Sequence, residues 1–517
     1  MLLRGHFYAL IKLNRQLRLS PENIFQWDKL KKDLSRKSVR GGITTLTSQG
    51  IQFLMRIMGT AVLARLLTPK DYGMIGMVTV VVNFAAMFKD AGLSMATVQK
   101  TEINDEQIST LFWLNILISA VLGLCVLAGS PLVAFFYRRS ELTAVTAVLS
   151  VSFIVSGLTI QHQALLRRHM RFTTLASIQI ASQVITLGIT ILLACLGWRY
   201  WALVGGSLAQ ALAGTLLTFY FCPWVPRRMQ KGTGVRDMLK FGGHLTGFNF
   251  VNYFSRQSDN ILIGRFIGAE ALGLYARAYN LFMMPITQIR SPLNDVAMPA
   301  LSSLRNQPER YVKYYQRLLD IMASLTIPLT MYCAIEADFL IRLLLGSKWL
   351  GAVPVFRILA IAGLIQAIAG TRGLVLLSCG FSRRYFYWGL FNAIVCVSSF
   401  VVGLRYGIEG VAMAYAIVNY VILVPSLFYC FPNTPVTITL FIKTLLPPLA
   451  LSSVVGLCLF IIKHNWSNES VAAHGVYMAF FVVVYGGLSM CRQSIRETLG
   501  MMMKVAIKTP AKEMETN

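Results

Sequence analysis

The stretch ITTLTSQGIQFLMRIMGTAVLARLLTPKDYGMIG, residues 43–76, is the part of this chain that decides its fold class. Two hundred residues later, without a gap, residues 243–276 read GHLTGFNFVNYFSRQSDNILIGRFIGAEALGLYA, a second copy of the same pattern. The alignment pairs Arg56 with Arg256, Arg65 with Arg265, Gly73 with Gly273 and Phe53 with Tyr253. An apolar helix with an arginine near its centre, present in two copies, is typical of membrane transport proteins built from internal repeats.

The composition indicates a polytopic membrane protein. Hydrophobic residues make up 55% of the chain and charged residues only 14%, whereas about a quarter of the residues of a soluble protein are charged. The formal charge of +26 comes from Lys and Arg between apolar runs, so we expect anionic membrane lipids as partners and no nucleic acid. The nine Cys and six His are scattered, which predicts neither a metal site nor a cofactor.

Apolar segments long enough to cross a bilayer, about 20 residues each, follow one another from residue 43 onward. We expect an all-α membrane protein with about fourteen such spans. The predicted spans are residues 43–67, 72–98, 109–136, 142–166, 172–196, 200–222, 238–267, 272–298, 318–345, 353–379, 385–404, 408–430, 441–462 and 471–490.

Lys and Arg collect in alternate loops, which by the positive-inside rule places both termini in the cytoplasm. The segment before the first span is basic, and Ser20-Pro21-Glu22 is a helix-start pattern. Either a short helix on the cytoplasmic leaflet or a partly disordered basic tail fits this segment.

The repeat extends beyond the first span of each half. The sixth span ends in FYFCP (219–223) and the twelfth in FYCFP (428–432). Six spans return the chain to its starting side, so the two units should share one orientation and be related by a pseudo-twofold axis along the membrane normal. The predicted division is a cytoplasmic N-terminal segment, an N-lobe, a cytoplasmic linker, a C-lobe, two further spans and a cytoplasmic tail: 1–41, 42–223, 224–236, 237–432, 433–491 and 492–517.

Charged side chains inside the spans are the candidate functional residues, because each costs about 2.5–3.5 kcal/mol at mid-bilayer. Arg56 lies close to the middle of the first span with no acid within a helical turn. Its guanidinium is therefore a candidate ligand for an anion such as a diphosphate, which needs fixed positive charge once it is desolvated. A packing role for Arg56, bound to backbone carbonyls or to an acid on another span, is the alternative.

Four further cations are candidates for the same anionic headgroup, each with a structural alternative. Arg256 has Asp259 three residues on, so an internal ion pair is the alternative there. Lys89 and Arg290 lie nearer the cytoplasmic end of their spans, where a neighbouring acid or snorkelling to the interface could neutralise them. Arg372, in AIAGTRGLV, has no acidic neighbour.

Three acids are candidates for ion or proton coupling. They are Asp259, Glu336 and Asp338. Glu336 and Asp338 approach the outer end of the ninth span, so solvation at the interface is the favoured reading of both.

Several stretches resemble one known family across nearly the whole chain. ARLLTPKDYGMIGM (64–77), FKDAGLSMATVQK (88–100), LFWLN (111–115), GRFIGAEALGLYARAYNL (264–281), MPALSSLRNQPER (298–310) and GSKWLGAVPVFRILAIAGL (346–364) resemble the polysaccharide-transporter family of the MOP flippase superfamily. The resemblance implies two six-helix lobes around a cavity, with the first and seventh helices facing each other across it. Lobe rocking would give alternating access.

The resemblance also implies a cargo and a location. These would be undecaprenyl-diphosphate-linked oligosaccharide repeat units of exopolysaccharide, capsule or O-antigen, the bacterial inner membrane, and polymerase or export machinery as further partners. A cation-coupled multidrug exporter of the same superfamily is one alternative, although the first span has arginine and no acid. A membrane glycan polymerase or ligase is another, although the short outer loops hold no catalytic constellation, so we expect no enzymatic activity.

Overall fold

The computed structural model describes residues 34–90, 92–100, 103–229, 253–254, 256–466, 470–490 and 496. Every regular element in these ranges is a helix, so the predicted all-α class is confirmed. Ten stretches of helix within these ranges are long and apolar enough to cross a membrane. The predicted N-terminal surface helix lies largely outside the described residues, and the count of fourteen spans stays a prediction.

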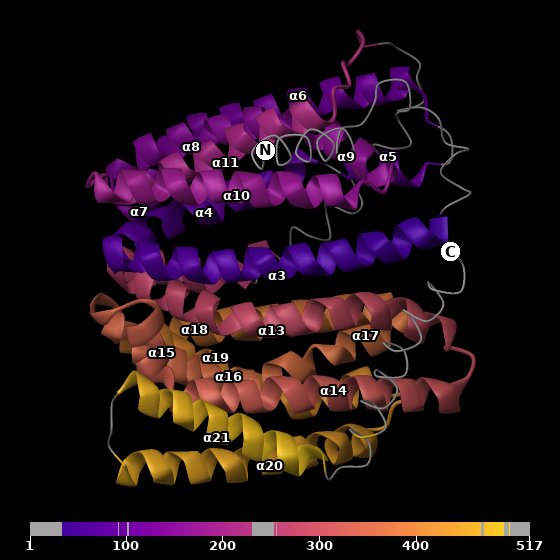
Figure 1. The fold of residues 1–517 in the computed structure, drawn as a ribbon, viewed down its shortest axis with the longest axis vertical. Helices are drawn as coiled ribbons and strands as arrows, with labels where there is room; N and C mark the ends of the chain where they lie inside the picture. Colours follow the sequence, from indigo (N-terminus) through magenta and orange to yellow (C-terminus); the bar gives the residue numbers. More distant parts are fainter. Residues whose placement is uncertain are drawn as a thin grey trace, which may run out of the picture. The chain divides into compact units, whose positions relative to one another are not determined.

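The chain forms two compact units. The first contains residues up to Gly273 together with Leu344–Lys348, and the second contains Leu274–Leu343 and the chain from Trp349 onward. Within each unit the long helices lie side by side with their axes roughly aligned (Figure 1).

The helices of the first half are as follows. They are α3 (Leu34–Leu66), α4 (Pro69–Lys89), α5 (Leu93–Gln99), α6 (Asp105–Ala128), α7 (Ser130–Tyr137), α8 (Glu141–Gly157), α9 (Ile160–Arg168), α10 (Phe172–Cys195) and α11 (Tyr200–Phe221).

The helices of the second half follow a similar order. They are α13 (Ala269–Ser303), α14 (Pro308–Ile335), α15 (Ala337–Leu344), η2 (Ser347–Ala352), α16 (Val353–Ala369), α17 (Thr371–Ser378), α18 (Ser382–Gly403), η3 (Leu404–Tyr406), α19 (Gly407–Cys430), α20 (Ile438–Asn465) and α21 (Val471–Met490).

The six-span repeat is visible in this order of elements. In both halves a long helix is followed by an eight-residue helix, α7 or α15, and then by a 17-residue helix, α8 or α16. A short helix, α9 or α17, and two long helices complete each copy. Several predicted continuous spans are thus broken in the structure, and the fourth and tenth break at equivalent places.

Local sequence explains where two of the helices begin. Thr68 caps α4: its Oγ1 accepts the backbone N–H of Asp71 at 3.3 Å, and Asp71 Oδ2 accepts the backbone N–H of Thr68 at 2.9 Å. Asn104 and Gln107 make the same reciprocal box at the start of α6. In α13, by contrast, three internal prolines do not end the helix, because neighbouring helices can satisfy freed carbonyls in a membrane protein.

Large apolar side chains point outward along many helices, as expected where the surrounding solvent is lipid. Leu124 on α6 is 60% exposed, Phe135 on α7 is 83% exposed and Val421 on α19 is 64% exposed. Exposed apolar surface of this extent is costly in water but favourable in a bilayer.

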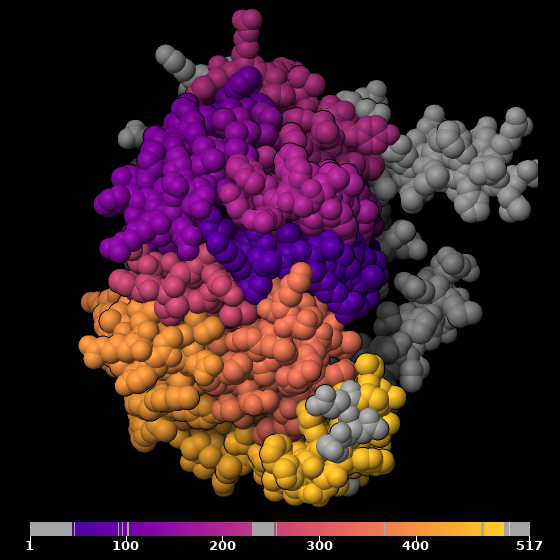
Figure 2. Space-filling model, turned by 90° about the vertical axis from the view of Figure 1, so that its left-hand side faces the viewer, coloured from indigo at the N-terminus to yellow at the C-terminus, as the bar shows by residue number. Residues whose placement is uncertain are grey.

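The last two helices, α20 and α21, lie outside the repeat and pack in the second unit. They form the yellow segment at the surface of that unit in Figure 2. Tyr332 of α14 packs against a buried cluster of side chains from both helices, including Leu459 and Phe481.

Candidate functional site

Arg56 lies on α3 beside the face that packs against α10. Gln52 donates from Nε2 to Gln179 Oε1 at 3.1 Å, and a Cβ at Gly59 would lie 2.5 Å from Leu187 Cδ2. Arg56 itself is exposed. Within the described ranges its guanidinium has no hydrogen-bond or ion-pair partner.

Arg256, the repeat mate of Arg56, is also exposed. Asp259 is buried, and its Oδ1 accepts the backbone N–H of Asn260 at 2.7 Å. Among the residues described, no ion pair joins Arg256 to Asp259. The internal ion pair considered from the sequence is therefore not formed between these two residues.

Lys89 ends α4 and reaches across to α8. Its Nζ donates to Ser156 Oγ at 2.8 Å. The neighbouring Asp90 turns away, because its Oδ1 accepts the backbone N–H of Ser94 at 2.9 Å and its Oδ2 accepts the Ser94 hydroxyl. Asp90 thus caps the start of α5, and the hydrogen bond that the described residues give the Lys89 ammonium goes to a neutral hydroxyl.

Arg372 lies just after the break between α16 and α17. Its Nε donates to Ala369 O at 2.7 Å, a carbonyl close to the break. Its Nη1 is buried and, within the described chain, has no partner. The adjacent Thr371 Oγ1 and the fully buried Tyr315 hydroxyl are 3.0 Å apart. This guanidinium therefore retains an unused donor, which an anion or water could fill.

Arg290 is half-buried on α13. The five candidate cations are divided between the two units. The first unit contains Arg56, Lys89 and Arg256, and the second contains Arg290 and Arg372.

The break between α8 and α9 has buried polar groups that the sequence did not single out. Gln161, the second residue of α9, accepts from Thr97 Oγ1 at 2.9 Å through Oε1, while its Nε2 has no partner in the described part of the chain. Asn115 and Ser119 on α6 are fully buried, and a Cβ at Gly157 would lie 2.4 Å from Ser119 Oγ. In each repeat, the second residue of the short helix after the break has a buried donor with no partner in the described chain. This donor is Gln161 Nε2 in the first repeat and Arg372 Nη1 in the second.

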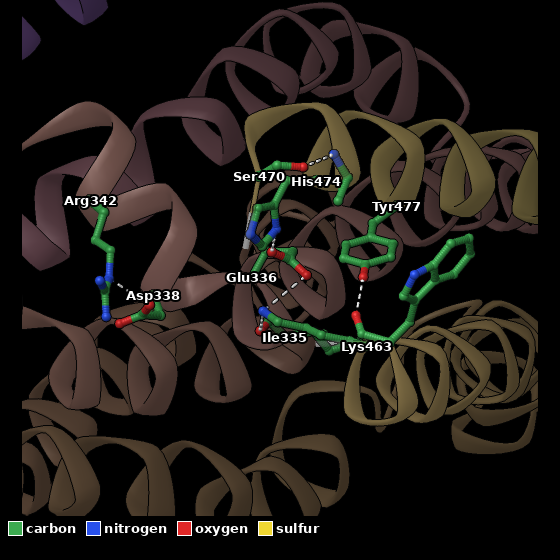
Figure 3. Close-up of polar contacts among 10 residues, drawn as sticks. Ile335, Glu336, Asp338, Arg342, Lys463, Ser470, His474 and Tyr477 are labelled. Carbon is green, nitrogen blue, oxygen red and sulfur yellow. Dashed lines mark hydrogen bonds and ion pairs between the residues drawn. The ribbon is translucent and has the colours of Figure 1, made fainter. Parts of the chain in front are cut away.

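The two candidate acids near the end of α14, Glu336 and Asp338, differ in burial and in their partners. Asp338 pairs with Arg342 at 2.8 Å on the partly exposed face of α15, in agreement with solvation at an interface. Glu336 is fully buried and pairs with Lys463 and His474 (Figure 3). The expectation that Glu336 is solvated is wrong, because α20 and α21 cover it.

Sequence reasoning missed both partners of Glu336. Lys463 directly follows one predicted span and His474 lies in the first turn of the next, so each looked like an ordinary residue of a membrane interface. Only the packing of α20 and α21 against α14 shows that they meet a buried acid.

A cavity of ≈ 510 Å³ lies between α14 and α21 in the second unit. Its walls are mainly apolar, with Asp320 and Ser489 among the polar residues that line it. No group of His, Cys, Asp and Glu suited to a metal ion occurs among the residues that the structure describes.

The apolar helices of bilayer length in the described residues define an all-α, multi-pass membrane protein. The structure of the lipid II flippase MurJ superposes with a TM-score of 0.70 at 14% identity, covering 88% of this chain and 98% of MurJ. A likeness at this identity establishes the fold alone.

A family model described as polysaccharide biosynthesis protein matches residues 62–354, more than half of the chain. The chain belongs to this family, and the resemblance drawn from its sequence is confirmed. It is 28% identical to the teichuronic acid biosynthesis protein TuaB of Bacillus subtilis, over 75% of this chain and 81% of TuaB. It is 23% identical to the lipopolysaccharide biosynthesis protein WzxC of Escherichia coli, over 76% of this chain and 81% of WzxC.

Proposed function

We propose that this protein flips undecaprenyl-diphosphate-linked oligosaccharide repeat units across the bacterial inner membrane by alternating access. The direction is from the cytoplasmic to the outer leaflet, for exopolysaccharide, capsule or O-antigen synthesis. Support comes from membership in the polysaccharide biosynthesis family, from the flippase fold and from relatives that act in surface-polysaccharide synthesis.

The observation that carries the proposal is the state of Arg56. A guanidinium in the first span has no partner within the described ranges, although an unpaired charge at mid-bilayer is costly. A diphosphate provides the missing partner, because its oxygens accept two parallel N–H bonds from one guanidinium. Lys89, Arg256, Arg290 and Arg372 supply further positive charge for the same headgroup.

A multidrug exporter of the same superfamily is the second transport function to test. Exporters of cationic compounds require a carboxylate at the substrate, whereas residues 43–67 contain two arginines and no acid. The charge of α3 therefore favours an anionic cargo.

An enzymatic role as polymerase or ligase is the third function, and we propose that the protein has none. Catalysis on sugars uses positioned acids, bases or nucleophiles in contact with the reacting group. Of the two candidate acids at the end of α14, Glu336 is already paired with Lys463 and His474, and Asp338 with Arg342.

The proposed setting follows from the charge distribution. Both termini face the cytoplasm, and the 48 Lys and Arg residues favour contact with anionic lipids there. Further partners are the polymerase and export machinery that use the flipped repeat unit. No cofactor, metal or nucleic acid takes part in the proposed mechanism.

Reconstitution into proteoliposomes tests the proposal. Undecaprenyl-diphosphate-oligosaccharide is placed in both leaflets, and its accessibility to an external glycan-modifying enzyme is followed. We expect faster exposure of the inner pool than in protein-free vesicles, with the oligosaccharide length unchanged. Transport of a cationic dye without lipid flipping would establish the exporter instead, and a change in glycan length would establish an enzyme.

A further inference from the structure

Glu336 is the C-cap residue of α14, and its carboxylate lies between two basic side chains from other helices. Its Oε1 is 3.1 Å from Lys463 Nζ on α20, and its Oε2 is 2.7 Å from His474 Nδ1 on α21 (Figure 3). The Glu336 side chain has no exposed area, and that of His474 is 7% exposed. A carboxylate in such a place needs both hydrogen bonds and a compensating charge.

The surroundings of His474 suit a protonated imidazole. Its ring lies flat on Phe339, with the ring centres 3.9 Å apart and the planes 12° from parallel. The Tyr477 ring makes a second contact with the His474 ring, with the ring centres 5.6 Å apart and the planes at 88°. An aromatic ring face and a carboxylate are both groups that attract a cation, so the geometry of the site can accommodate a protonated imidazole.

The other titratable groups on the helices around His474 have partners or surroundings of their own. Asp338 and Arg342 of α15 pair with each other, and the Tyr477 hydroxyl donates to Trp466 O at 2.7 Å. His464 of α20 is exposed and stacks on Phe460. Tyr332 and Cys333 of α14 are buried and neutral in this range of pH. Lys463 and His474 are thus the two basic groups that contact the Glu336 carboxylate.

We propose that Glu336, Lys463 and His474 form a proton-binding site that fastens α21 to α14. Lys463 balances the charge of Glu336, and a second proton on His474 turns its hydrogen bond to the carboxylate into an ion pair. Histidine is the side chain that ordinarily titrates between about pH 5 and 8. The fastening is therefore strong at acidic pH and weakens as pH rises and His474 loses its proton.

The site links regions that are distant in sequence and different in origin. Glu336 belongs to the repeat, whereas Lys463 and His474 belong to the two helices outside it. Beside the apolar cavity, α14 and α21 also meet where Tyr332 packs on Phe481, with ring centres 5.6 Å apart, and where Tyr485 donates to Ser324 O at 3.1 Å. Proton release at His474 therefore loosens the contact at the end of α21 that begins at Val471.

Thermal unfolding of the full-length protein in lipid nanodiscs tests this inference without a transport assay. We expect the melting temperature of the wild type to fall by about 1 °C, the equivalent of ~1 kcal/mol for a chain of 517 residues, between about pH 5.5 and 8. His474→Gln should lose this dependence, because glutamine donates a hydrogen bond but does not titrate. His464→Gln, the matched histidine on α20, should keep the wild-type dependence.

A second variant makes the test independent of how well His474→Gln folds. Lys463→Met leaves protonated His474 as the cation that balances Glu336, so its melting temperature should fall more steeply with pH than that of the wild type. An unchanged or flatter slope in Lys463→Met, or a wild-type slope in folded His474→Gln, would overturn the proposal.

Discussion

Gly73 and Gly273 make reciprocal backbone contacts with each other's helix starts. A Cβ at Gly73 would lie 1.6 Å from the carbonyl oxygen of Ala269, and a Cβ at Gly273 would lie 1.8 Å from that of Pro69. The two glycines are 200 residues apart in the sequence, and so are the two residues that they contact, Pro69 and Ala269. The first turns of α4 and α13 are therefore related by a local twofold arrangement, which leaves no room for a side chain at either glycine.

Gly73→Ala and Gly273→Ala should each destabilise the protein by about 1–3 kcal/mol or more, because the methyl group meets backbone that cannot rotate away. Gly188→Ala in α10 is the matched control, since nothing lies within 4 Å of its Cβ. Alanine is the better helix former, so the control should be neutral or stabilising. Thermal unfolding in detergent measures all three, and equal melting temperatures would contradict the contact.

Glu336→Gln should cost about 3 kcal/mol of stability, because it leaves two basic groups facing a neutral side chain. We take the low end of the range for broken buried pairs, since the Lys463 side chain is 30% exposed. Asp338→Asn is the control: its pair with Arg342 is half-exposed, and we expect a loss of about 0.3–0.5 kcal/mol. Similar losses in the two variants would show that burial of Glu336 has no energetic consequence.

Lys89→Met should slow flipping of the lipid-linked oligosaccharide by about 10–100-fold, the equivalent of one charged hydrogen bond of ~1.5–3 kcal/mol. Ser156→Ala removes the hydroxyl that accepts from Lys89 Nζ but leaves the ammonium in place. This control should retain most of the wild-type rate in proteoliposomes. If Ser156→Ala is as slow as Lys89→Met, the hydrogen bond between α4 and α8 matters and the charge does not.

The repeat and the charges could be read from the sequence because they are local patterns. The 200-residue offset aligned Gly73 with Gly273 in sequence, although their spatial contact was not predicted. The missing acid near Arg56 singled out this guanidinium, which has no partner within the described ranges. The breaks at Gly157 and Gly370 were not predictable, since the hydropathy of the fourth and tenth spans continues through them. A broken helix differs from a straight one in packing, which composition does not encode.

The surroundings of the acids depended on tertiary structure. Glu336 and Asp338 are two residues apart and looked alike in sequence, yet one is fully buried and the other partly exposed. The difference comes from Lys463 and His474, more than 120 residues downstream. Likewise, neutralisation by Asp90 was one alternative for Lys89 in the sequence, but the Asp90 carboxylate caps α5, because free backbone N–H groups at a helix start attract a carboxylate.

The rate at which Arg56 variants flip undecaprenyl-diphosphate-oligosaccharide in proteoliposomes tests the central claim most directly. Arg56→Ala should be slower than wild type by about 10–100-fold, and Arg56→Lys should be intermediate, because lysine keeps the charge but not the two-pronged geometry. Arg65→Ala, at the end of the same helix, should flip at the wild-type rate. Wild-type flipping by well-folded Arg56→Ala would contradict the claim that this guanidinium binds the diphosphate.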